Sequence, residues 1–138
     1  MNVGDAEEAR FAVQPSDSAQ ALEMAPGDSF PNVLATSRMV TFMEIAATRL
    51  MRPLLEPGQH SVGVAVHIKH TAPTPIGGNV RTVATYLGPD GKLFRFKVEA
   101  FDDAGPIGDG EHTRAIVTTN RLLAGAAKRA PSAATAPT

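Results

Sequence analysis

The sequence contains no cysteine and no tryptophan, and it has no long uninterrupted apolar run. Without cysteine the protein has no disulfide, no thiolate nucleophile and no cysteine-based zinc site, which agrees with a reducing compartment. The first ten residues are acidic and lack an apolar stretch, so we expect neither a membrane span nor a secretory signal. These absences together favour a cytoplasmic protein.

An excess of positive charge is also missing. The formal net charge is −1, and the lysines and arginines are scattered along the chain, so nothing resembles the basic stripe that binds a phosphate backbone. The histidine spacings do not match zinc-ligand patterns, and no carboxylates cluster with them. We therefore expect no nucleic-acid partner, no metal and no other cofactor.

The chain of 138 residues is long enough for one domain and too short for two. Residues 1–9 are polar and predict a flexible N-terminus, whereas residues 10–123 carry the domain. The small, proline-rich residues 124–138 predict a disordered tail, although residues 122–127 fit a short amphipathic helix.

Apolar periodicity predicts one helix and five strands. A first strand includes Phe11 and Val13, and a nearly all-apolar helix covers residues 37–51, with Thr36 or Ser37 as N-cap and Pro53 closing it. Strands are expected at residues 61–71, 78–87, 93–101 and 107–119. This order predicts an α+β fold in which an antiparallel sheet wraps a buried helix, and its open edges predict a dimer.

Three residues carry reactive side chains, a carboxylate, a hydroxyl and an imidazole, within largely apolar segments. Glu44 lies on the buried helix, Thr36 lies at its start, and His70 ends a strand on the face shared with Val62, Val64, Val66 and Ile68. Each has a structural alternative. Glu44 could pair with a buried arginine such as Arg114, Thr36 could cap the helix, and His70 could be a core histidine.

The remaining histidines are expected at the surface. Strict alternation places Gly63, Ala65, His67 and Lys69 on the strand face opposite His70, so His67 is predicted to be solvated. His60 and His112 are predicted to be exposed as well.

Several motifs occur in a specific order along residues 30–122. They are Thr36, Met39-Val40-x-x-Met43-Glu44, Leu55-Glu56-Pro57-Gly58, Gly63, His70-Thr71-Ala72-x-Thr74-Pro75 and Gly110-x-His112-x-Arg114-Ala115. This set resembles the fluoroacetyl-CoA thioesterase group of hotdog-fold enzymes. The resemblance implies a hotdog fold, a homodimer and hydrolysis of a short acyl-CoA thioester at the interface between the two protomers.

The resemblance also implies residue roles. Thr36, Glu44 and His70 would be catalytic: Glu44 as nucleophile or base for water, His70 as acid and base, and Thr36 as a positioning group or as the nucleophile. Gly63 would admit the acyl carbonyl, and Arg114 would hold the carbonyl side or the CoA moiety. Phe30 would line the acyl pocket.

The sequence departs from the group in places that bear on the acyl preference. Of the aromatic side chains ahead of the threonine only Phe30 remains, Gly27 occupies the position of another, and Ile45 stands where a tryptophan would follow the glutamate. The alternative function is a non-catalytic acyl-CoA binding or sensing module on the same fold. A hydratase of a related hotdog group would need an Asp and His pairing that is missing near His70.

Overall fold

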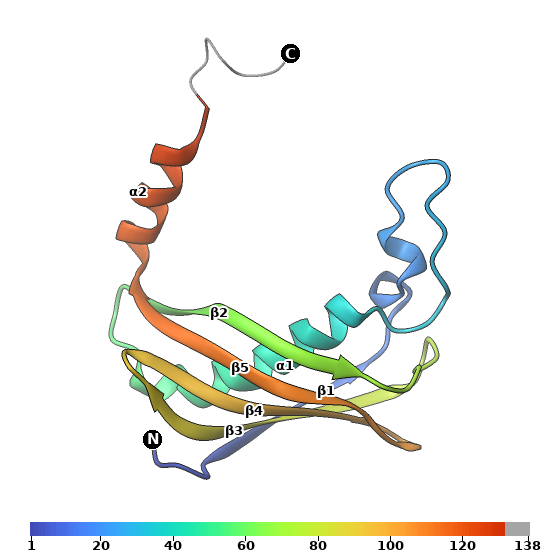
Figure 1. Ribbon diagram of the computed structural model, residues 1–138, viewed down its shortest axis with the longest axis horizontal. Helices are drawn as coiled ribbons and strands as arrows, with labels where there is room; N and C mark the ends of the chain where they lie inside the picture. Colours follow the sequence, from blue (N-terminus) through green and yellow to red (C-terminus); the bar gives the residue numbers. More distant parts are fainter. Residues whose placement is uncertain (132–138) are drawn as a thin grey trace.

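One antiparallel sheet and one long helix form the body of the protein, for which the computed structural model describes residues 1–131. The elements are β1 (Ala6–Ala12), the single-turn 3₁₀ helices η1 (Pro15–Asp17) and η2 (Gln20–Leu22), α1 (Thr36–Met51), η3 (Arg52–Leu54), β2 (Gln59–His70), β3 (Asn79–Asp90), β4 (Leu93–Asp102), β5 (Gly105–Thr118) and α2 (Thr119–Arg129). The strand order is β1-β3-β4-β5-β2, with antiparallel neighbours throughout. The sheet curves across α1, as the α+β prediction required (Figure 1).

The predicted domain boundaries differ from the structure at both ends. β1 begins at Ala6 and pairs with β3, and Ala9 is buried in the core, so an ordered strand starts inside the segment 1–9 predicted to be flexible. At the other end α2 continues to Arg129, within the predicted tail, because its alanines and leucines favour helix. Residues 132–138 lie outside the described part of the chain.

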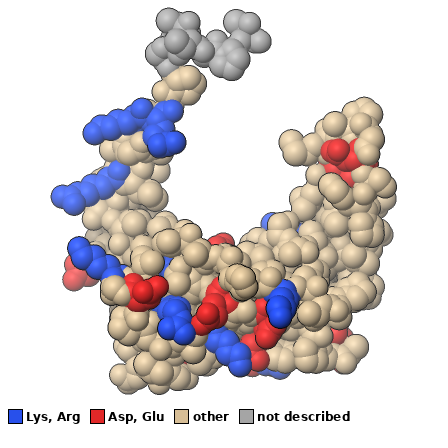
Figure 2. Space-filling view, in the orientation of Figure 1, with Lys and Arg blue, Asp and Glu red and all other residues tan. Residues whose placement is uncertain are grey.

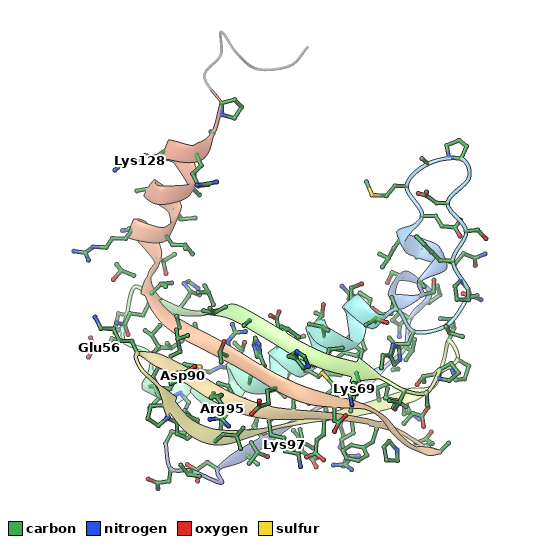
Figure 3. All side chains as sticks on the ribbon, in the orientation of Figure 1. Glu56, Lys69, Asp90, Arg95, Lys97 and Lys128 are labelled. Carbon is green, nitrogen blue, oxygen red and sulfur yellow. The ribbon has the colours of Figure 1, made fainter. Side chains whose placement is uncertain are left out.

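The core lies between α1 and the concave face of the sheet. α1 buries the face that contacts the strands, which consists of Met39, Phe42, Met43, Ala46, Ala47 and Met51. The apolar sequence of α1 predicted a helix that is buried on all sides. In the structure its other face is only half-buried, so its own chain does not enclose it completely. The convex face of the sheet carries charged side chains, among them Lys69, Arg95 and Lys97 (Figure 3), and Arg95 pairs with Glu111 at 3.0 Å.

A β-bulge changes which residues of β2 face the helix. The register with β5 runs from Gly63↔Arg114 directly to Ala65↔Thr113, so Val64 is an extra residue in β2. The extra residue reverses the alternation, because a shift of one position exchanges the two faces of a strand. Gly63 and His70 therefore face the same side of the sheet, and the prediction that they lie on opposite faces was wrong.

The two edges of the sheet are β1 and β2. β2 is an edge of 12 residues, and two apolar side chains near its middle are exposed to solvent, Val64 by 53% and Val66 by 42%. α2 rises from one end of this edge and the segment containing η1 and η2 rises from the other (Figure 1). The hollow between them is lined largely by uncharged residues (Figure 2).

Within residues 1–131, neither α1 nor α2 combines the length and the hydropathy needed to cross a bilayer.

Candidate active site

Thr36 and His70 form a direct pair at the start of α1. Thr36 Oγ1 lies 2.8 Å from His70 Nδ1, which joins the first residue of the helix to the last residue of β2. The N-cap of α1 is Ala35, and no side chain caps the helix, so the prediction that Thr36 or Ser37 is the N-cap was wrong. Because the Thr36 hydroxyl is not used by the helix backbone, it is free to bond the imidazole.

The other nitrogen of His70 is available for a ligand. Among residues 1–131, His70 Nε2 has no hydrogen-bond partner although this atom is buried. Burial lowers the pKa of His70 below its ordinary value, an effect that the backbone of Ala72 partly opposes. At neutral pH the imidazole is therefore mainly neutral and can either accept or donate a proton.

Glu44 belongs to a second group of side chains, in which it faces β5. Glu44 Oε1 lies 3.9 Å from His112 Nε2 and 3.9 Å from Arg114 Nη1. Both distances exceed hydrogen-bond range, so the carboxylate lies close to the two groups without being bonded to either. The predicted alternative was that Glu44 pairs with a buried arginine such as Arg114; the two charges are close, at 3.9 Å, but they share no hydrogen bond.

Arg114 is held from two sides. Its Nε donates to Ser61 Oγ at 3.1 Å, its Nη2 donates to the Ser61 carbonyl at 2.8 Å, and its Nη1 lies 3.1 Å from His112 Nε2. The residue is 5% exposed. A guanidinium held in this way presents a fixed positive charge to Glu44.

Gly63 lies against this second group. A Cβ atom on Gly63 would come within 2.6 Å of Glu44 Oε1 and 3.3 Å of His112 Cε1. A contact of 2.6 Å is too short for carbon and oxygen, so any side chain here would displace the carboxylate. Only glycine lets the β2 backbone come this close to Glu44.

Within one chain the two groups are separated. Thr36 and Glu44 are eight residues apart on α1, which corresponds to about 12 Å of helix rise. The structure thus brings Thr36 to His70, and Glu44 to Gly63 and Arg114, but it does not join the two groups.

Phe30 lies in neither group. It is exposed in the segment between η2 and α1, and its backbone N–H donates to Glu23 Oε2 at 2.9 Å. This segment projects away from the sheet (Figure 1).

His112 was missed by the sequence reasoning. It was predicted to be exposed, but it is 2% exposed and bonds the Ala65 carbonyl through Nδ1 at 2.8 Å. Its spacing from Arg114 could have predicted its burial, because residues two apart on a strand share a face and Arg114 was already considered as a buried arginine. His60 and His67 are exposed, as predicted.

Comparisons with known proteins identify the family of the chain. A family described as fluoroacetyl-CoA-specific thioesterase, FlK, matches residues 13–120. The chain belongs to this family. It is 36% identical over 134 residues to a fluoroacetyl-CoA thioesterase from Streptantibioticus cattleyicolor, with 96% of each chain covered.

Solved structures extend the similarity to the fold. A structure of the fluoroacetyl-CoA thioesterase FlK is 36% identical, with a TM-score of 0.89 over 95% of this chain and 98% of that one. A threonine-to-serine variant of FlK, 35% identical with a TM-score of 0.88 over 95% of this chain and all of that one, was solved with acetyl-CoA. A hot-dog-like protein from Thermanaerovibrio acidaminovorans, 23% identical, shares the fold with a TM-score of 0.80 over 94% of this chain and 93% of that one. The predicted hotdog fold, family and enzyme class, a thioesterase, are confirmed.

Proposed function

We propose that the protein hydrolyses a short acyl-CoA thioester to the free acid and CoA, with Thr36, Glu44 and His70 as catalytic residues. The observation that carries this proposal is the hydrogen-bonded pair of Thr36 and His70, 2.8 Å apart, in a member of a thioesterase family. The acetyl-CoA complex of the related FlK variant supports a CoA thioester as the substrate.

The chemistry requires an oxygen nucleophile, a stabilised oxyanion and a proton for the leaving thiolate. Glu44 either attacks the thioester carbonyl or removes a proton from water; in either route a C–O bond forms and the C–S bond breaks. Thr36 is the alternative nucleophile, because neutral His70 can take its hydroxyl proton. In each route the departing sulfur takes a proton from His70, and His70 regains one from the Thr36 hydroxyl or from the water that becomes part of the acid. Where Glu44 or Thr36 is the nucleophile, water then hydrolyses the acyl-enzyme, which breaks its C–O bond to the side chain and releases the free acid.

The proposed site is completed by a second copy of the chain at the β2 edge. Gly63 and His70 lie seven positions apart on β2, roughly 20 Å along the strand. Antiparallel pairing of two β2 edges about a two-fold axis places the Gly63 end of one copy opposite the His70 end of the other. The exposed Val64 and Val66, and the uncharged hollow above this edge (Figure 2), support such pairing.

Three further residues are proposed to contact the substrate. The Gly63 backbone admits the thioester carbonyl beside Glu44, and the buried Arg114 acts on the carbonyl side, because its guanidinium is too enclosed to reach the CoA phosphates. Phe30, on the projecting segment, covers the acyl group. Apolar pockets distinguish acyl chains by only about 1–3 kcal/mol per methylene, so this segment sets the acyl preference with modest energies.

The test is thiol release from a panel of acetyl-, fluoroacetyl- and aromatic acyl-CoA esters, measured with a colorimetric thiol reagent. The protein has no cysteine and adds no background. We expect release from at least one ester, and a loss of about a hundredfold or more in kcat for Glu44→Gln. The matched control is Glu56→Gln, an exposed glutamate at the surface (Figure 3), which should keep wild-type activity.

Two outcomes contradict the proposal. Full activity in Glu44→Gln would remove Glu44 from the mechanism. Tight binding of CoA esters by a folded dimer without any thiol release would identify the protein as an acyl-CoA binding module.

A further inference from the structure

The surroundings of His112 assign a definite tautomer to this histidine. Its Nδ1 lies 2.8 Å from the carbonyl oxygen of Ala65, and a carbonyl can only accept, so Nδ1 carries the proton. Its Nε2 lies 3.1 Å from Arg114 Nη1, and a guanidinium can only donate, so Nε2 is the acceptor. Both bonds exist together only in the neutral imidazole.

From this arrangement we infer that His112 is a positioning residue for the proposed reaction: it holds the guanidinium of Arg114 in place facing Glu44. The inference rests on the proposed function. His112 belongs to the motif Gly110-x-His112-x-Arg114-Ala115, in which the resemblance implied a role for Arg114 alone. Its position is fixed by the β2 bulge, which brings the Ala65 carbonyl to Nδ1 where regular pairing is interrupted.

The groups that face His112 explain why its protonation state matters. Arg114 lies beside it on β5, Glu44 faces it from α1, and the Ala65 carbonyl faces it from β2. In the sheet it is paired with Val66 of β2 and Phe96 of β4, which carry no charge. Burial lowers the pKa of His112, and the Arg114 charge lowers it further, whereas Ala65 and Glu44 oppose the shift.

Protonation of His112 would break this arrangement in two ways. Nε2 would no longer accept the Arg114 hydrogen bond, and a second cation would stand 3.1 Å from the guanidinium. The imidazolium would also attract the Glu44 carboxylate, which lies 3.9 Å away, and draw it from the position proposed for attack or for activating water. Activity should therefore decline in acid partly because His112 gains a proton.

The experiment compares His112→Phe with His112→Gln. Phenylalanine keeps the ring but provides neither a donor for Ala65 nor an acceptor for Arg114, whereas the glutamine oxygen can accept from Arg114 and does not titrate. We expect kcat to fall about a hundredfold in His112→Phe with a smaller change in KM, because a misplaced catalytic group costs about this much. We expect kcat of His112→Gln to be about tenfold higher than kcat of His112→Phe.

The pH profile separates positioning from a purely structural role. On the acid side, kcat of His112→Gln should decline at a lower pH than kcat of the wild type, because position 112 no longer titrates. His67→Gln is the matched control, since His67 is exposed on the same sheet, and it should keep the wild-type pH profile. Circular dichroism and thermal melts establish that each variant is folded.

The outcomes are distinct. A folded His112→Phe variant with kcat within about threefold of an active wild type would overturn this inference alone, as would an unchanged acid side of the pH profile in His112→Gln. Nitrogen NMR showing the proton on Nε2 instead of Nδ1 would overturn it independently of activity. A wild-type protein that releases no thiol would overturn the proposed function on which the inference rests.

Discussion

The half-buried His70 and the buried His112 differ in how fully their nitrogens are bonded. His112 uses both nitrogens within the chain, on the Ala65 carbonyl and on Arg114. His70 uses only Nδ1, on Thr36, while its buried Nε2 has no partner among residues 1–131. A buried polar atom without a partner is costly, so it is retained where a ligand completes it. The comparison indicates a fixed group around Glu44 and an open group around His70.

Substitutions in the two groups should have a large effect on activity, and mixing the variants shows whether the groups come from different chains. Glu44→Gln and His70→Asn should each lose at least about a hundredfold in kcat. If each site takes Thr36 and His70 from one chain and Glu44 from the other, a mixed dimer of the two variants has one intact site. Co-expressed variants should then regain about a quarter of wild-type activity, since half of the dimers are mixed and one of their two sites is intact.

The outcome of this complementation distinguishes two geometries. Recovery of thiol release after mixing supports a site shared between protomers. If the purified mixed dimer is as inactive as either parent, Thr36, Glu44 and His70 act within one chain.

The open group can be tested by removing its internal bond. Thr36→Val deletes the hydroxyl that lies 2.8 Å from His70 Nδ1 while keeping the shape of the side chain. We expect kcat to fall by about a hundredfold, with Thr36→Ser retaining most of the activity because it keeps the hydroxyl. Steady-state kinetics on the preferred ester measure both, and equal activity of the valine and serine variants would contradict a role for the hydroxyl.

The fixed group can be tested at Gly63. In Gly63→Ala the new Cβ would lie 2.6 Å from Glu44 Oε1, so the carboxylate must move. We expect a loss of about tenfold or more in kcat/KM from this displacement. Gly125→Ala is the matched control, because a Cβ on Gly125 meets nothing within 4 Å. Wild-type kinetics in a folded Gly63→Ala protein would show that the close approach has no catalytic meaning.

The two histidines should also have a modest effect on stability. Burial lowers the pKa of both His70 and His112, so the unfolded chain binds more protons than the folded chain between the lowered values and about 6.5. The contribution of the two histidines to the free energy of unfolding should therefore be fully present above about pH 6.5. It should decrease as the pH falls from there through the folded pKa values. Urea unfolding at several pH values measures the slope, which should be shallower in His112→Gln. An unchanged slope would contradict the lowered pKa of His112.

Much of the fold followed from local patterns. The apolar periodicity around Met39–Met51 predicted α1, and Pro53 predicted its end, which falls at Met51. The turn residues around Gly91 and Asp103 separated the last three strands. These patterns work because helix and strand periods, and the turns between them, are local properties of the chain.

The site was less predictable, because it depends on contacts between distant segments. Alternation placed Gly63 opposite His70, and a single extra residue in β2 reversed this. Thr36 was expected to cap its helix but bonds His70, 34 positions away. His112 was expected in solvent but is enclosed by α1, β2 and β5.

The element types, the family and the identity of the chemical groups follow from the amino-acid sequence, since these depend on residue type, order and spacing. Which of these groups meet depends on how the chain folds in three dimensions. The β2 bulge, the enclosure of Arg114 by Ser61 and His112, and the division of the site into two groups all arise from pairing between β2 and β5 and from packing on α1. Such contacts form between residues far apart in the chain, so the local periodicity of helices and strands does not predict them.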